Sequence, residues 1–178
     1  MYEKDKIIEA EYFYSRMSQE QNDRDAFRHN LSAFLSAARS VLQYALKEAE
    51  TKTGGKQWYD TQVSGYPALK FFKDKRDINI HASPVQFRQD VNVHITETVR
   101  GIASVSFVVR DKDGNIKSQS SEEPPPPVVR VPETPPIVTY HFFFDDWSGD
   151  EDILTVSQTY LDNIKSIVAD GVQKGFLS

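Results

Sequence analysis

The sequence predicts an α+β fold that is mainly helical, with four helices and a β-strand insert between the third and the fourth. Apolar residues recur at helical spacing within residues 6–84 and again within 149–178. Between these stretches apolar and polar residues alternate and prolines accumulate, which favours strands and extended chain. We therefore expect one domain over residues 1–178, with a helical bundle (6–84 and 149–178) and a β- and proline-rich insert (85–148).

The first two helices are expected over about residues 6–21 and from Asp23 to the Gly54–Gly55 pair. Either Asn22 or Asp23 suits the N-cap of the second helix, and glycines are typical helix ends. The second helix has the clearest pattern, because its apolar side chains are spaced alternately by four and three residues. These side chains are Phe27, Leu31, Phe34, Ala38, Val41 and Ala45.

The third helix is expected from Pro67, which suits a first helical turn, to about His81. Pro84 prevents simple continuation, because proline lacks the N–H donor and restricts the residue before it. The fourth helix is expected to begin near residues 149–151, where acidic side chains favour the positive end of a helix. Its apolar side is expected to complete the bundle.

Within the insert, strands are expected over residues 91–95, 102–109 and 137–144, with a hairpin turn at Asp113–Gly114. Residues 122–136 contain most of the prolines and are expected to run as extended polyproline II. The aromatic residues from Tyr140 to Phe144 are expected in the core or on the buried side of the insert, with part of them at a subunit interface.

Composition excludes several classes of protein. The chain has 178 residues, no cysteine and a formal charge of −5, so disulfide frameworks, thiol catalysis and cysteine-containing zinc sites are excluded. The first residues show no secretory signal and no stretch is apolar enough for a membrane helix, so we expect a cytoplasmic protein with no membrane contact. No cofactor or metal is indicated. Any contact with nucleic acid must rest on a local basic patch.

The segment Arg76-Asp77-Ile78-Asn79-Ile80-His81 contains the residue types that cleave RNA without a metal ion. A guanidinium group binds phosphate through paired hydrogen bonds and stabilises the negative charge that develops on it. An imidazole takes the 2′-hydroxyl proton or protonates the leaving oxygen. Arg76 and His81 are therefore candidate catalytic residues, and Asp77 is a candidate for orienting either of them.

A regular helix does not place Arg76 and His81 on one face, because residues five positions apart differ by about 140° around the axis. Two solutions remain open. The helix unwinds between the two residues, which the β-branched Ile78 and Ile80 and the nearby Pro84 favour, or the site is assembled across the two-fold axis of a dimer.

This segment and its surroundings resemble the HEPN superfamily of bacterial and archaeal helical-bundle proteins. The signature of that family is Arg, a polar residue, and His after four to six intervening positions. The resemblance covers about residues 8–84. Within them, residues 30–42, Trp58–Tyr59 and residues 71–81 look similar to a group of uncharacterised bacterial HEPN-like proteins. It implies a homodimer whose two motifs face one cleft. Active members are metal-independent endoribonucleases, many of them toxins or defence effectors, whereas inactive members serve as dimerisation or binding modules.

Two other segments, 24–29 and 88–94, fit the same spacing of arginine and histidine. The first begins the long second helix with no break, and the second lies in the insert. Only Arg76 and His81 end an apolar, aromatic helix, where the family places its motif.

Each candidate also has a plainer interpretation. Lys70, Lys73 and Lys75 form either an RNA-binding patch with Arg76 or an ordinary charged helix face. His81 is also favourably placed against the negative end of a helix dipole. The acidic residues 145–152 either bind a cation or favour the start of a helix, and residues 111–115 mimic part of a calcium loop but suit a hairpin turn better.

Two functions follow as hypotheses. The first is a HEPN-type, metal-independent endoribonuclease that acts on RNA as a homodimer, in a toxin-antitoxin or defence setting. The second is a non-catalytic HEPN-like dimerisation or binding module, in which the insert or its proline-rich segment engages a protein partner.

Overall fold

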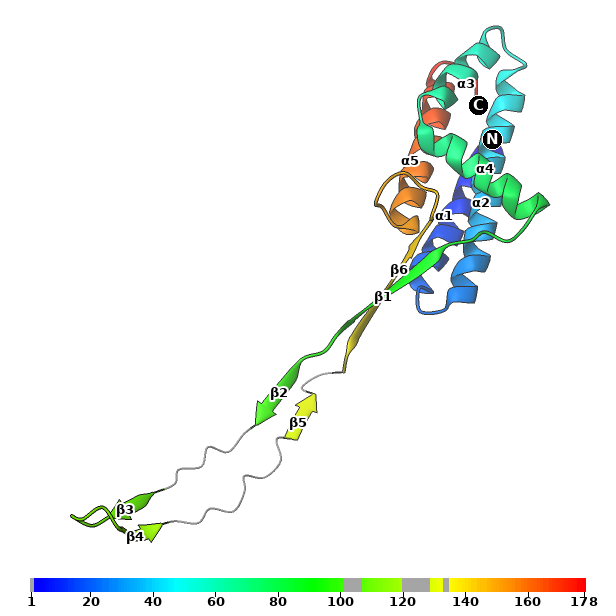
Figure 1. Ribbon diagram of the computed structural model, residues 1–178. Coiled ribbons are helices and arrows are strands. Elements are labelled where there is room, and N and C mark those ends of the chain that lie inside the picture. Colours follow the sequence, from blue (N-terminus) through cyan, green and yellow to red (C-terminus); the bar gives the residue numbers. More distant parts are fainter. Residues whose placement is uncertain (1, 101–106, 120–128, 133–134) are drawn as a thin grey trace. The chain divides into compact units, whose positions relative to one another are not determined.

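The computed structural model describes residues 2–100, 107–119, 129–132 and 135–178. These residues form an α+β fold that is mainly helical, as expected (Figure 1). The helices are α1 (Tyr2–Gln19), α2 (Arg24–Ala49), α3 (Gly55–Ser64), α4 (Pro67–His81) and α5 (Ile153–Gln173). The strands are β1 (Arg88–His94), β2 (Glu97–Arg100), β3 (Val108–Arg110), β4 (Ile116–Gln119), β5 (Val129–Pro132) and β6 (Ile137–Phe143).

The chain divides into two compact units. One consists of Met1–Val91 and Thr139–Ser178 and contains all five of the helices described above; we call it the helical unit. The other is Asn92–Val138, which we call the ribbon unit. The strands β1 and β6 each begin or end in one unit and continue into the other.

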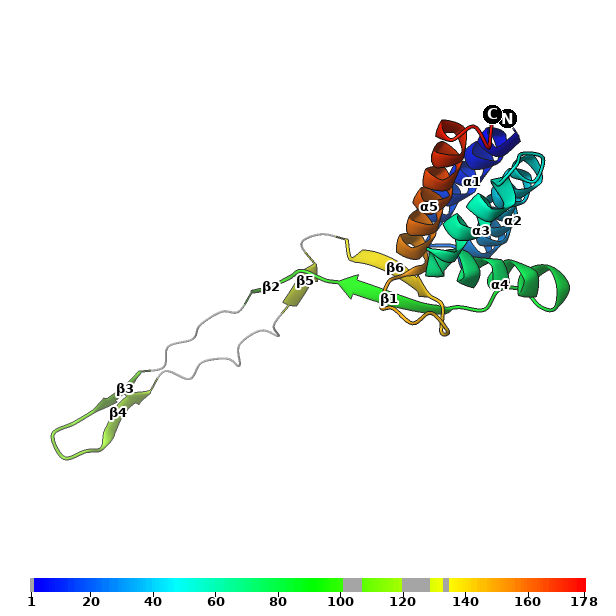
Figure 2. The same cartoon turned by 90° about the horizontal axis from the view of Figure 1, so that it is seen from above.

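In the helical unit, α1, α2 and α5 lie side by side and α4 runs across α2 (Figures 1 and 2). The predicted four-helix bundle is not confirmed, because α4 crosses its neighbours and α3 is a fifth helix. The expected boundaries of the other helices are close to those observed. Asp23 is the N-cap of α2, and its carboxylate accepts hydrogen bonds from the backbone N–H groups of Asp25 and Ala26.

The two glycines begin α3 rather than end α2, contrary to the prediction, because α2 ends at Ala49 and α3 starts at Gly55. Gly54 has a left-handed backbone with φ of +79°, and Gly55 packs so closely on the end of α2 that a Cβ atom there would lie 2.0 Å from the Ala49 carbonyl oxygen. The helix then buries Trp58 and Tyr59. The indole N–H of Trp58 donates to Asp170 of α5 over 2.6 Å, which joins α3 to α5.

The core of the helical unit is largely aromatic where α4 meets its neighbours. Phe72 of α4 stacks on Tyr160 of α5, with ring centroids 4.5 Å apart and planes inclined by 3°. Phe142 of β6 stacks on Phe27 of α2 at 3.9 Å, so the start of α2 is packed against a strand. Phe142 and Phe144 are both buried. The expectation that the aromatic run of β6 lies in the core is confirmed for these two residues.

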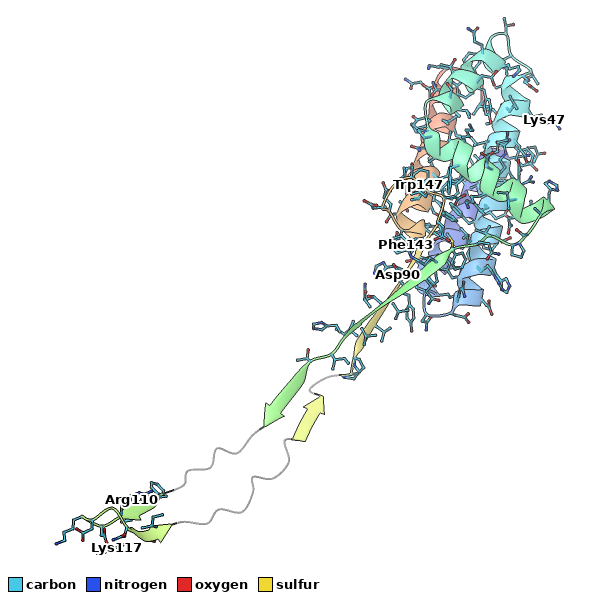
Figure 3. All side chains as sticks on the ribbon, in the orientation of Figure 1. Lys47, Asp90, Arg110, Lys117, Phe143 and Trp147 are labelled. Carbon is cyan, nitrogen blue, oxygen red and sulfur yellow. The ribbon has the colours of Figure 1, made fainter. Side chains whose placement is uncertain are left out.

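The strands pair in a nested order: β3 with β4 and β2 with β5 within the ribbon unit, and β1 with β6, both of which extend into the helical unit. The first two pairs are antiparallel. The turn between β3 and β4 is the predicted hairpin, with Gly114 at φ of +88°. Arg110 and Lys117, one from each strand, mark this hairpin in Figure 3.

The proline-rich segment is not extended polyproline II throughout. Residues 129–132 form β5 and pair with β2, with Pro132 opposite Glu97 at the end of the ladder. Each sheet of this unit has two strands, so a proline there occupies an edge, where no second neighbour needs its missing N–H. Residues 120–128 and 133–134, and residues 101–106 of a predicted strand, lie outside the described part of the chain.

Candidate functional site

All six residues singled out in the sequence lie on α4. Pro67 occupies the first turn of this helix, and Ala68, Leu69 and Phe72 are buried against the rest of the helical unit. The opposite side of the helix faces solvent, so Lys70, Lys73 and His81 are exposed, whereas Lys75, Arg76 and Asp77 are half-buried.

The ammonium group of Lys75 is used within the chain. Its Nζ lies 2.5 Å from a carboxylate oxygen of Asp146, and it also lies 5.3 Å from the ring centroid of Phe71 and 5.1 Å from that of Phe144. The side chain is only 11% exposed. Lys75 therefore fixes the loop that follows β6 to α4, and its charge is compensated before any phosphate arrives.

Arg76 is paired with its neighbour. Its Nη1 donates to Asp77 Oδ1 over 3.1 Å, and the arginine side chain is 23% exposed. Its Nε is buried without a hydrogen-bond partner among the described residues. Asp77 is thus the ion-pair partner of Arg76, and the buried Nε of Arg76 is not exposed to solvent.

The helix does not unwind between Arg76 and His81, so that expectation is wrong. α4 is helical as far as His81, and the N–H groups of Ala82 and Ser83 both return to the carbonyl of Ile78. Pro84 constrains only the residue before it, which leaves the turn at His81 intact. Arg76 and His81 of one chain therefore lie about 140° apart around the axis, and His81 is exposed at the negative end of the helix dipole.

Asn79 lies inside the motif, had no expected role, and links the end of α4 to two other parts of the chain. Its side-chain amide donates to Ser32 Oγ of α2 over 2.7 Å and accepts from the backbone N–H of Val85 over 3.3 Å. The first contact joins α4 to α2, and the second fixes the chain that leads into β1. The sequence does contain a sign of this role, because Asn79 is a single amide between Ile78 and Ile80.

A second group of cations surrounds a hollow of about 530 Å³ between α2, α3 and α4. Lys70 and Lys73 line it from α4, and Arg39 lines it from α2. Its apolar lining comes from Leu42, Val63, Tyr66, Pro67 and Leu69. The structure thus brings Lys70 and Lys73 together with an arginine that the sequence did not single out, and separates both from Lys75.

Arg39 lies near two buried tyrosines. Burial raises the pKa of the Tyr59 hydroxyl, and the positive charge of Arg39 opposes that rise. The hydroxyl of Tyr160, whose pKa burial also raises, lies close enough to Arg39 to experience its charge. In the described residues Arg39, Lys70 and Lys73 form no ion pair, whereas Asp60, at the rim of the hollow, is paired with Lys56 at 2.9 Å.

The remaining candidates have structural roles. Asp111 accepts from the N–H groups of Asp113 and Asn115, and the Asn115 hydrogen bond is the main cause of the lowered pKa of its carboxyl. Asp152 is the N-cap of α5 and lies 3.3 Å from His141. Burial raises the pKa of the Asp152 carboxyl, but hydrogen bonds from Thr155 and His141 outweigh this and leave it below its ordinary value.

The two other arginine–histidine segments are also engaged in packing. The Arg24 guanidinium lies 5.6 Å from the ring centroid of Phe87, and Arg88 pairs with Asp90 at 3.0 Å. Among the residues that the structure describes, no three His, Cys, Asp or Glu side chains are grouped as a metal site would require. Within the same residues, no helix is both long and apolar enough to cross a membrane.

Comparisons with protein families, with curated proteins and with solved structures give no match for this chain.

Proposed function

We propose that this chain is a non-catalytic interaction module, in which a HEPN-like helical body carries a β insert that engages a protein partner. The observation that supports this proposal is the exposure of the ribbon unit. Every described side chain from residue 92 to 138 is exposed except that of Asp111, which is half-buried. The exposed apolar residues include Val93, Ile95, Phe107, Val108, Val109, Ile116, Ile137 and Val138.

A two-stranded ribbon of this kind has no core of its own, and isolated two-stranded hairpins are marginally stable in water. Contiguous exposed apolar side chains mark an interaction surface, and open strand edges accept a further strand from a partner. Complete burial of one Val, Ile or Phe side chain contributes about 1.5–3 kcal/mol. A partner that covers a few of these residues therefore supplies the stability that the ribbon lacks.

The charge of the ribbon favours protein over nucleic acid. Five Lys or Arg side chains and six Asp or Glu side chains lie within residues 92–138. A phosphate backbone requires a net positive surface, whereas an apolar ribbon of almost no net charge suits an apolar protein surface.

A ribbon variant, Phe107→Ser with Val109→Thr and Ile116→Thr, tests the proposal. Ile8→Thr, which changes an exposed apolar residue of α1, is the matched control because Ile8 is 64% exposed on the helical unit. A partner captured by the full chain is purified, and its affinity is measured against all three forms. The proposal expects at least a tenfold loss for the ribbon variant and no change for Ile8→Thr. Equal affinity of the ribbon variant and the parent chain overturns it.

The second candidate function is metal-independent cleavage of RNA by a homodimer, with Arg76 and His81 as catalytic residues, Asp77 as the orienting residue and Lys70, Lys73 and Lys75 as RNA-binding residues. It is favoured by the exposure of His81 at the end of α4, on the helix that also carries a half-buried arginine. Because the two side chains diverge within one chain, this function requires that His81 of one protomer meet Arg76 of its partner.

RNA cleavage in the presence of a chelator is the measurement for this second function. Activity that yields 2′,3′-cyclic phosphate ends, and that is lost in both Arg76→Ala and His81→Ala, supports it. His29→Ala is the control, since His29 is an exposed histidine in the competing segment 24–29. RNA that stays intact with the folded wild-type dimer excludes it.

A further inference from the structure

The hollow between α2, α3 and α4 has the composition of a small-molecule site. Its volume of about 530 Å³ falls within the range of roughly 300–1,000 Å³ that ligand pockets occupy. Apolar side chains make up half of its lining, and the cationic groups come from α2 and α4. All of the lining residues belong to the helical unit.

The charges of the hollow are unbalanced toward positive. Arg39, Lys70 and Lys73 have no carboxylate partner among the described residues, while the one lining carboxylate, Asp60, is already paired with Lys56. The positive end of the α4 dipole adds to this field, because Tyr66 and Pro67 at the start of that helix also line the hollow. Three cations without counterions in a confined space favour an anion there.

Arg39 is the partly packed member of the group. It is half-buried on α2, whereas Lys70 and Lys73 are exposed on α4. A guanidinium whose side chain is already partly packed loses less conformational freedom when it takes an oxyanion through two parallel hydrogen bonds. Lys70 and Lys73, one turn apart on α4, add point charges that need no fixed geometry.

The apolar lining distinguishes the ligand from a bare ion. Leu42, Val63 and Leu69 come from three different helices, so an apolar group seated between them displaces water from each. We propose that this hollow binds a small organic oxyanion, with its phosphate or carboxylate group at Arg39, Lys70 and Lys73 and its apolar part against Leu42, Val63 and Leu69. This site is separate from Arg76 and His81. It shares Lys70 and Lys73 with the second candidate function but requires neither of the functions proposed above.

Titration of the full chain with phenyl phosphate, followed by calorimetry and by backbone amide shifts, tests the proposal. We expect saturable binding with shifts at Val63 and Leu69. Arg39→Gln is expected to weaken binding at least tenfold, because a charge-assisted hydrogen-bonded pair is removed. Lys52→Gln is the control, since Lys52 is exposed and lies outside the hollow. The double variant Lys70→Gln with Lys73→Gln covers the case in which Arg39→Gln does not fold, and it is expected to weaken binding to a similar extent.

Other probes decide between the parts of the proposal. Benzoate and phenyl phosphate share the apolar ring and both are expected to bind, whereas inorganic phosphate and benzyl alcohol, each lacking one part, are expected to bind at least tenfold more weakly. Equal binding of benzyl alcohol overturns the anion site, and equal binding of inorganic phosphate overturns the apolar part. Binding of a single-stranded RNA without any binding of phenyl phosphate, or no binding of any probe at 10 mM, overturns the proposal altogether.

Discussion

Replacement of Lys75 by Met tests whether this lysine stabilises the fold through contacts within the chain. The substitution keeps most of the aliphatic stem and removes the charge that lies 2.5 Å from Asp146 and above two aromatic rings. Each cation–π contact of a largely buried ammonium contributes about 0.5–2 kcal/mol, and an ion pair whose carboxylate is 61% exposed adds at most about 1 kcal/mol. We expect Lys75→Met to lower the free energy of unfolding by about 1–3 kcal/mol.

Thermal unfolding followed by circular dichroism measures this effect. For a chain of 178 residues, a loss of 1–3 kcal/mol corresponds to a fall in Tm of roughly 3–10 °C. Lys73→Met is the control, because Lys73 is exposed on the same helix, and its effect is expected to stay within about 0.5 kcal/mol. In 1 M NaCl only the ion-pair part of the difference is expected to shrink, since exposed charges are screened. If Lys75→Met and Lys73→Met unfold at the same temperature, Lys75 does not anchor α4 and the reasoning is refuted.

Three further predictions concern the contacts that hold the helical unit. The carboxyl pKa of Asp152 is lower in the folded chain than in the unfolded one, so the ionised group stabilises the fold above its ordinary pKa, and this contribution is lost as pH falls through the folded value. In urea unfolding between pH 2 and 7, we therefore expect the free energy of unfolding to fall less steeply with acid in Asp152→Asn than in the parent chain. Equal slopes of free energy against pH count against this prediction. A Cβ at Gly171 lies 2.6 Å from both Leu177 and Trp58, so Gly171→Ala should cost about 1–2 kcal/mol while Gly65→Ala, with its nearest contact at 3.5 Å, should not; similar melting temperatures would contradict this. Asn79→Ala removes two hydrogen bonds and should lower the free energy of unfolding by about 1–3 kcal/mol. Backbone amide exchange at the end of α4 is expected to become faster, and unchanged exchange would contradict the prediction.

The elements that could be predicted from the sequence are those with a repeated local signal. α2 and α5 show long apolar stripes, and α4 begins at a proline and ends before another. α3 was missed because it has only ten residues between glycines and buries two aromatic side chains rather than a full stripe. The strand β5 was missed because prolines normally argue against pairing, and only the absence of a second neighbour in a two-stranded sheet makes Pro132 acceptable.

The candidate site likewise has features that follow from local sequence and features that depend on distant residues. That Arg76, Asp77 and His81 end one helix follows from local pattern, but the orientation of each side chain depends on distant partners. Lys75 differs from Lys73 only because Asp146 and Phe144, far along the sequence, lie over it. Arg39 gave no local signal, since its place in the hollow depends on two lysines of another helix. Periodicity reports which face of a helix is buried, not which partner a charged residue meets.

Oligomeric state bears on both proposed functions in different ways. Arg76 and His81 are five residues apart on an unbroken helix, which separates them by about 140° around the axis and about 7.5 Å along it. The side chains of Arg76 and His81 of one chain cannot both contact one ribose-phosphate unit without a large displacement of the arginine. Catalysis therefore requires a dimer whose two copies of α4 lie together. The interaction module requires a second chain at the ribbon instead. Sedimentation of the ribbon variant and of a variant of the exposed Ile78 and Ile80 of α4 distinguishes the two arrangements. If the dimer is lost only in the ribbon variant, the partner is a second copy of the chain bound through its ribbon, and the two α4 helices lie apart. If the dimer is lost only in the variant of Ile78 and Ile80, the two copies of α4 lie together in the dimer, which is the arrangement that RNA cleavage needs.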